Sequence, residues 1–273
     1  MTAPAVPMEV GAPAQRFRDT LASEWVKVST LHAVYPLLAL ATGIAVGIGA
    51  LLSATTGDSY AALGPAGRSV FDPVATALSA MPYANVIVAA MAVTLVASEY
   101  QSGMMRLTLT MTPGRWRVLC AKLLTVAGPA LLSGMLSAAL AVAVGLRLLS
   151  ARGVPTPGLG DAGVVAAVAG AGAGTCLVAV LSVCLAVTVR RIAVANGLTN
   201  LIALLPGILY PLPDWWQRNL VAYLPTGASG SLAGTVAGRT PAHLPALAAY
   251  AVMLGWAAAL VLATGVALTR RDA

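Results

Sequence analysis

Six long stretches without a single acidic residue constrain the fold of this chain more than any other feature of its sequence. They lie near residues 34–53, 74–97, 119–146, 163–188, 192–212 and 245–268. Since a helix rises about 1.5 Å per residue, each can cross a hydrocarbon layer about 30 Å thick. Charged residues make up only 9% of the chain, against about 25% in soluble domains. The sequence therefore predicts an all-α polytopic membrane protein with six transmembrane helices.

The residues before the first stretch predict a helix of another kind. Residues 1–14 show no usable periodicity, and we expect a disordered tail. Across 15–33, apolar residues recur every three or four positions with charged residues between them; they are Phe17, Leu21, Trp25, Val28 and Leu31. This spacing predicts an amphipathic helix lying in the bilayer interface, with a soluble lead-in to the first span as the alternative. Residues 34–273 are then one six-span transmembrane domain.

The distribution of lysine and arginine predicts the orientation. With the N-terminus inside, eleven cations fall inside: Arg16, Arg18, Lys27, Arg106, Arg115, Arg117, Lys122, Arg190, Arg191, Arg270 and Arg271. Five fall outside: Arg68, Arg147, Arg152, Arg218 and Arg239. Because cytoplasmic loops carry the excess of Lys and Arg, we expect both termini in the cytoplasm, N-in/C-in. The loop 98–118 is then cytoplasmic and the long loop 213–244 is outside.

Several function classes are disfavoured by what the chain lacks. All nine Asp and Glu residues lie outside the six stretches, which disfavours a carrier driven by protons or sodium. His32 and His243 fall on opposite sides of the membrane, so we expect neither a metal site nor an intramembrane enzyme. The cations form short clusters beside apolar runs, so no nucleic acid partner is expected.

The chain also lacks the sequence of a phosphate-binding loop for ATP. A phosphate-binding loop needs a Gly-Lys pair, but the two lysines here, Lys27 and Lys122, follow Val26 and Ala121. We therefore expect a chain that is not an enzyme and holds no cofactor. Any uphill transport would depend on a separate subunit.

The cytoplasmic loop 98–118 concentrates charge between two apolar stretches. Within it, residues 105–112 alternate strictly between apolar and polar side chains, which locally indicates a strand. A lone strand beside a bilayer would leave its backbone unpaired, so we expect a short helix instead. Thr112 and Pro113 are predicted to be the N-cap and first residue of the next helix, which runs into the third span.

The same loop carries a family resemblance. Glu99-Tyr100, Gly103 and Arg106 are followed by Pro113, Arg115 and the run Ala121-Lys122-Leu123. This order resembles the intracellular loop of ABC-2 type transporter permeases, the membrane subunits of bacterial ABC exporters, whose pattern is roughly E-Y-x-x-G-T-x-R, a Pro-Arg turn and A-K-L. The chain departs from that pattern at Gln101, where a basic residue is usual, and at Met104, where threonine is usual.

The resemblance implies a coupling helix that docks into a groove of a separate ATP-binding subunit, where ATP and Mg are bound. The implied coupling residues are Glu99, Tyr100, Gly103, Met104, Arg106 and Arg115. Glu99 would pair with an arginine or cap the helix, and Arg106 would meet an acidic site; for Arg115 a purely topological role explains the charge equally well. The family also implies a second permease copy, in a homodimer or heterodimer, and a place in the bacterial inner membrane.

Polar residues within the spans are few. Possible pathway-lining residues are Asn85, Thr94, Ser133, Asn196, Thr199 and Asn200, although hydrogen bonding between helices is the simpler explanation for each. A pathway without charge suits a hydrophobic or amphipathic cargo, such as a drug, an antibiotic or a lipid-like molecule.

The outer loop 213–244 contains a cluster of aromatic residues. Asp214 and Gln217 are spaced as a helix-capping pair, and a short helix is expected to end at Pro225. Asp214 with Trp215, Trp216 and Tyr223 forms either an outer lid or an aromatic anchor at the headgroup level.

Two functions remain open. The first is the permease subunit of an ATP-driven exporter. The second is a non-transporting immunity or scaffold protein that acts by binding its target in the bilayer. An ATPase that co-purifies with the chain would favour the first.

Overall fold

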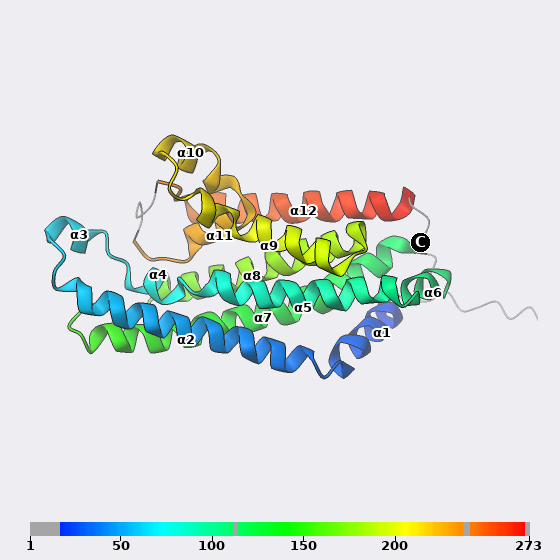
Figure 1. Ribbon diagram of the computed structural model, residues 1–273, viewed down its shortest axis with the longest axis horizontal. Helices are drawn as coiled ribbons and strands as arrows, with labels where there is room; N and C mark the ends of the chain where they lie inside the picture. The colour runs from blue at the N-terminus through cyan, green and yellow to red at the C-terminus, as the bar shows by residue number, and fades with distance from the viewer. Residues whose placement is uncertain (1–16, 112–113, 237–240, 271–273) are drawn as a thin grey trace, which may run out of the picture.

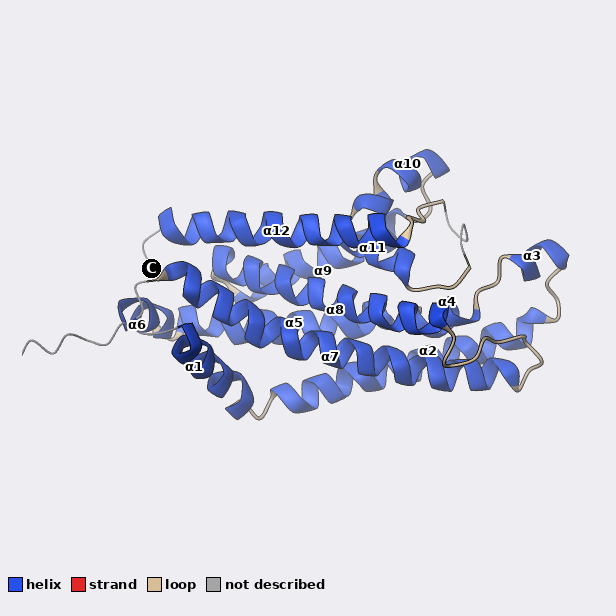
Figure 2. Cartoon of the chain, turned by 180° about the vertical axis from the view of Figure 1, so that it is seen from behind, coloured by secondary structure: helices blue, strands red, loops and turns tan. Residues whose placement is uncertain are grey.

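A computed structural model describes residues 17–111, 114–236 and 241–270, and every regular element in these ranges is a helix (Figure 2). The elements are α1 (Phe17–Thr30), α2 (Val34–Tyr60), α3 (Pro65–Ser69), α4 (Pro73–Leu78), α5 (Met81–Gln101), α6 (Met104–Met111), α7 (Arg115–Ser150), α8 (Ala162–Val189), α9 (Ile192–Leu209), α10 (Asp214–Asn219), η1 (Val221–Tyr223), α11 (Pro225–Leu232) and α12 (Ala246–Arg270).

The described residues contain six helical segments long and apolar enough to cross a membrane, which confirms the predicted fold class. They are α2, the pair α4–α5, α7, α8, α9 and α12. The second span is interrupted between Leu78 and Met81, where α4 ends and α5 begins. At the tight hairpin between α8 and α9, Arg190 takes a left-handed conformation with φ 60°. A reversal can then follow without a longer loop.

The spans lie side by side along the long axis of the molecule (Figure 1). One end of the bundle, which we call the α6 end, gathers α1, α6 and the C-terminal turn of α12; the other, the α11 end, gathers α3, α10 and α11 (Figure 1). Arg115 of α7 donates to the carbonyl oxygen of Leu268 at 2.6 Å, which ties the start of α7 to the end of α12.

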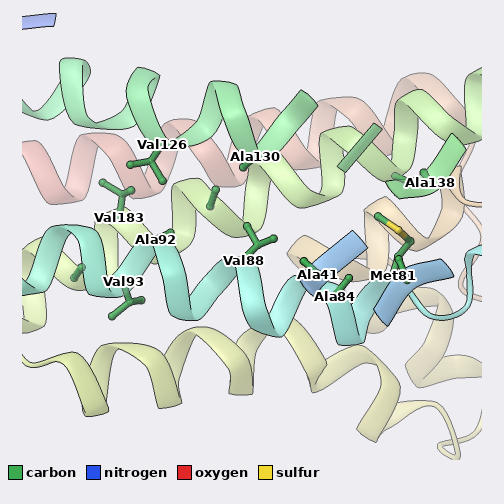
Figure 3. Packing of buried hydrophobic residues seen from close by; sticks show 14 of the residues in the cluster. Ala41, Met81, Ala84, Val88, Ala92, Val93, Val126, Ala130, Ala138 and Val183 are labelled. Carbon is green, nitrogen blue, oxygen red and sulfur yellow. The ribbon is translucent and has the colours of Figure 1, made fainter. Parts of the chain in front are cut away.

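Small side chains let the helices approach closely around α8, which packs against α5, α7, α9, α11 and α12. In Figure 3, alanine and valine side chains of α5 face Val126 and Ala130 of α7 and Val183 of α8. A Cβ added at Gly134 of α7 would lie 2.6 Å from the Cβ of Thr175 in α8. Since lipid tails are as apolar as these side chains, close van der Waals packing is what holds such helices together.

After α9 and α10 the chain returns to the bundle, and α11 packs against its helices. A Cβ at Gly170 would lie 2.4 Å from the Cβ of Leu232 in α11. Gly170 is eight residues into α8, or about 12 Å along its axis. The segment α11 therefore lies alongside the first turns of α8, and it also packs against α9 and α12.

The predicted helix in the loop 213–244 is shorter than expected. It ends at Asn219, and Pro225 begins α11 instead of ending the earlier helix. The predicted capping pair is also wrong, because the amide of Gln217 donates to the carbonyls of Tyr210 and Leu212, at 2.8 and 3.0 Å. These carbonyls follow the last turn of α9, where helix geometry leaves acceptors without partners.

The predicted helix in the loop 98–118 is confirmed as α6, and α7 continues from Arg115 through the third span. Thr112 and Pro113, the expected N-cap and first helical residue, lie outside the described residues, as does the expected tail 1–14. The helix α1 is confirmed over 17–30; its place in a bilayer interface stays a prediction. Its buried residues are Thr20, Glu24 and Val28, while Trp25 is exposed. Glu24, one of the charged residues between the apolar positions, therefore lies on the buried face of α1.

Candidate functional site

Four charged side chains from three helices meet at the α6 end. The ammonium of Lys122 in α7 lies 2.7 Å from Glu24 Oε2 in α1 and 2.5 Å from Glu99 Oε2 in α5. Lys27, also in α1, lies 2.5 Å from Glu24 Oε1 and 3.5 Å from Glu99 Oε1. Each lysine thus contacts both carboxylates and each carboxylate contacts both lysines. We call these four residues the charge ring.

Three of the four side chains in the charge ring are almost fully buried. The side chains of Lys122, Glu24 and Glu99 are 2%, 4% and 13% exposed. Lys122 is seven residues into α7, about 10 Å from the start of a 36-residue helix about 54 Å long. The ring therefore lies near one edge of a hydrocarbon layer, at some distance from its middle. Its net charge is zero, and mutual pairing compensates the loss of hydration that burial imposes.

The pKa of Lys27 reflects the same competition between burial and pairing with the carboxylates. Burial lowers the pKa of this ammonium, but its hydrogen bond with Glu24 and the nearby charges of Glu99 and Glu24 outweigh burial, so the pKa lies above its ordinary value of 10.5. Lys27 is then cationic at neutral pH.

Sequence reasoning missed this ring, although one signal was present. Lys27 and Lys122 are the chain's only lysines among sixteen cationic residues, and both lie in the ring. A lysine ammonium is a compact charge with three rotatable donors, which suits the space between two carboxylates. Reserving lysine for two positions is therefore a usable sign of a shared site. The resemblance assigns Glu99 to partner contacts, but in this chain its carboxylate is bound within the bundle.

The helix α6 presents an apolar surface away from the bundle. Met105 is fully buried against the core, whereas Met104, Leu107 and Met111 are exposed. Leu107 and Met111 are 62% and 67% exposed, and spacings of three and four residues place the three side chains on one helical face. We call Met104, Leu107 and Met111 the α6 stripe. Exposed apolar clusters of this kind mark interaction surfaces.

The other predicted coupling residues occupy different positions around α6. Tyr100 is partly buried and lies beneath the guanidinium of Arg190, 5.2 Å from the ring centroid. Gly103 connects α5 to α6 with φ +74°, a conformation that favours glycine. Arg106 is exposed on α6, and Arg115 reaches the last carbonyls of α12. Of the six predicted coupling residues, Met104 and Arg106 are therefore the two whose exposed side chains belong to α6.

The predicted pathway residues do not form one lining. Asn85 accepts a hydrogen bond from Thr175 at 2.9 Å. Asn200 donates to Asn196 within α9 at 3.0 Å, and Thr199 is buried and bonds to its own helix. The two remaining residues differ in exposure, with Thr94 exposed and Ser133 partly buried. Among the described residues, no group of His, Cys, Asp or Glu side chains could hold a metal ion.

A cavity of about 440 Å³ lies at the α11 end. Its walls come from the end of α4, the first turns of α5, α8, the second half of α9 and α11. Asn85 is the one predicted pathway residue that lines it. The volume falls within the range of about 300–1,000 Å³ typical of small-molecule sites.

The cavity and the α6 stripe are at opposite ends of the bundle. No family model matches this chain, and a search of curated proteins finds no match. The function must therefore be argued from these two sites and the residues between them.

One buried carboxylate fastens the outer wall of the cavity. Asp72 caps α4 by accepting from the amides of Val74 and Ala75, both at 3.0 Å. Its second oxygen accepts from the amides of Thr235 and Val236, at 2.6 and 2.8 Å. Because α4 and α11 both line the cavity, this carboxylate ties the segment after α11 to the opposite wall.

We expect Asp72→Asn to release this segment while leaving α4 capped. Asparagine caps a helix about as well as aspartate, but its amide nitrogen cannot accept from Thr235 and Val236. Amide hydrogen exchange at these two residues should rise about tenfold, the effect of losing about 1.4 kcal/mol. Asp58→Asn is the control, since Asp58 at the same end pairs with Arg152 on the surface. Unchanged exchange at residues 235–236 in Asp72→Asn would contradict this assignment.

The predicted aromatic residues lie beside this end. Trp215 and Trp216 meet edge to face, with centroids 5.1 Å apart, and both are exposed, as is Tyr223. Asp214 is within 3.6 Å of Arg218 one turn along α10. The carbonyl of Tyr223 accepts from the indole of Trp256 in α12, at 2.8 Å. This contact ties η1 to the last span, and whether the cluster acts as a lid or an anchor stays a prediction.

Proposed function

We propose that this chain is the permease subunit of an ATP-driven exporter of the ABC-2 type in the cytoplasmic membrane of a bacterium. The α6 stripe is the observation that carries the proposal. An eight-residue helix between the second and third spans buries Met105 and leaves three large apolar side chains uncovered. A separate ATP-binding subunit with an apolar groove is the partner that such a helix would fit.

The distribution of charge supports an orientation in which α6 meets its partner in the cytoplasm. Among the described residues, nine lysines and arginines belong to segments at the α6 end and four to segments at the α11 end. We therefore infer that the α6 end faces the cytoplasm, where ATP is available. The α11 end, with its cavity, then faces outward.

The charge ring supports a mechanical link between the partner and the spans. The stripe is on a helix whose two neighbours in sequence are α5 and α7. The ring joins Glu99 near the end of α5 to Lys122 near the start of α7 and to two residues of α1. A displacement of α6 by a closing partner would therefore be passed to three helices held together by ion pairs. In this account Glu99 acts as a positioning residue within the chain.

A second copy of the permease completes the proposal. The spans α2, α9 and α12 are much less buried than α5 and α8, so a second copy could cover part of their surface. Six spans enclose little space on their own, and we infer a dimer with two ATP-binding subunits.

The decisive experiment is affinity purification of the full chain from its native membranes, followed by measurement of co-purifying, vanadate-sensitive ATPase activity. Leu107→Asp should lower that activity at least about tenfold, because a charge in an apolar groove loses its hydration. Thr110→Asp is the matched control, since Thr110 is exposed on the same helix but off the stripe. It should retain activity near that of the wild type.

Two outcomes would reject the proposal. One is equal loss of ATPase in both variants, which would separate the effect from the stripe. The other is a chain that never retains an ATPase, even after crosslinking in membranes, yet keeps its full biological effect. That result would favour a non-transporting immunity or scaffold protein.

A further inference from the structure

The cavity at the α11 end has a chemical character that narrows what it can bind. Among its described lining residues none carries a charge, and nine of the twenty are alanine or glycine. The small residues leave backbone and a few polar side chains accessible, and no charged group is present to neutralise an ion. A charged ligand would lose its hydration there without compensation.

Three serine and threonine hydroxyls of the lining can act toward a ligand only as acceptors. The hydroxyl of Thr226 donates to the carbonyl of Ala203 at 2.7 Å, and that of Ser229 donates to the carbonyl of Thr226 at 3.0 Å. The hydroxyl of Ser79 donates to the carbonyl of Thr76 at 2.6 Å. Since each hydroxyl proton is already used, these oxygens can offer a ligand only their lone pairs.

Asn85 supplies the complementary donor. Its side-chain oxygen accepts from Thr175, at 2.9 Å, which orients the amide. Its nitrogen has no acceptor among the described residues, so two N–H bonds remain for a ligand. An acceptor group on a bound ligand would give these N–H bonds a partner within the cavity.

We propose that this cavity binds an uncharged amphipathic molecule that carries a hydroxyl group. The hydroxyl would donate to the serine and threonine oxygens and accept from Asn85 Nδ2, while the apolar part lies against the alanine, leucine and methionine side chains. Under the proposed function this molecule is the cargo, and in that respect the inference rests on that function. Binding itself needs no ATP-binding subunit, so the two proposals can fail separately.

Two glycines at the cavity allow it to be filled without disturbing the backbone. Gly207 in α9 and Gly230 in α11 both line the cavity, and a Cβ at either position would meet no atom within 4 Å. Gly207→Leu and Gly230→Leu should therefore fold and occupy the cavity from two different helices. Gly197 in α9 is equally open but does not line the cavity, so Gly197→Leu is the matched control.

The test uses the full chain in nanodiscs and a monoacylglycerol with a diazirine in its acyl chain. Light-induced adducts should map to the lining segments of α5, α9 and α11. Unlabelled monoacylglycerol should compete, whereas the fatty acid and the alkyltrimethylammonium of the same chain length should compete at least about tenfold less. A hydroxysteroid is also tested as a competitor. Whichever of the hydroxysteroid and the unlabelled monoacylglycerol competes better shows whether the cavity favours a compact ligand or a lipid.

Each cavity-filling variant should lower specific labelling at least about tenfold, and Gly197→Leu should leave it unchanged. Thermal unfolding of all three variants establishes that they fold; if one does not, the other still decides. Labelling spread evenly over the lipid-facing surfaces of α2 and α12 would overturn the proposal. So would charged competitors as effective as neutral ones, or full labelling in a folded variant with a filled cavity.

Discussion

Lys122→Met is expected to destabilise the chain by about 3–5 kcal/mol, the range for removing one partner of a buried ion pair. The substitution leaves Glu24 and Glu99 facing each other with only Lys27, whose side chain is partly exposed, to balance them. Two carboxylates so close together in a poorly solvated place repel each other. Thermal unfolding of the purified chain, followed by the loss of monodisperse protein on size exclusion, measures the effect.

A variant that lacks all three buried charges distinguishes the cost of unpaired charge from the cost of changed side-chain packing. Lys122→Met combined with Glu24→Gln and Glu99→Gln leaves Lys27 as the one charge of the ring. Because the side chain of Lys27 is 28% exposed and can be hydrated, most of the lost stability should return. Arg147→Met controls for the loss of a cation from the same helix, because Arg147 is exposed and surface changes are usually within about 0.5 kcal/mol. A single Lys122→Met variant that melts with the wild type would show that the ring does not hold α1, α5 and α7 together.

The same variants also separate folding from coupling. Glu99 and Lys122 are the two charged residues at the edges of the family-like motif, and in this chain they pair with each other. If the triple variant folds but its co-purifying ATPase no longer responds to cargo, the ring transmits motion. If it folds and couples normally, the ring serves stability alone, and under the proposed function the α6 stripe would be left to carry the coupling.

The membrane-spanning helices could be predicted from the sequence because each depends only on the residues of its own apolar stretch. A run of about twenty apolar residues can satisfy its backbone in a bilayer only as a helix, so length and composition decide the outcome. The helix over Met104–Met111 was predictable for the same reason, since an isolated strand there would have unpaired amides. These predictions needed no knowledge of which helices are neighbours.

The sites were largely missed because they join residues far apart in the chain. Glu24 and Lys122 are separated by 98 positions, and Asp72 and Thr235 by 163. Periodicity in α1 suggested an apolar stripe from Phe17 to Leu31, but the helix turns Glu24 inward because a lysine of α7 is there to receive it. The cavity depends on the return of α11 into the bundle, which the prediction of a single outer helix ending at Pro225 did not contain.

Gly227→Ala is expected to displace α11, because an added Cβ would lie 1.9 Å from the carbonyl oxygen of Val221. Both partners are backbone, so no side chain can move aside, and either η1 or the start of α11 must shift. Overpacking of a well-packed site costs about 1–3 kcal/mol, and we expect the upper end here. Thermal unfolding of the purified chain measures this loss.

Gly230→Ala, three residues along the same helix, should act in the opposite direction. A Cβ there meets no atom within 4 Å, and alanine restricts the unfolded chain more than glycine, which stabilises compatible sites by about 0.4–1 kcal/mol. The two variants add the same methyl group to one eight-residue helix, so their difference reports only on where α11 lies. If both raised or both lowered stability, α11 would not pack against η1 as described, and the outer wall of the cavity would have to be placed elsewhere.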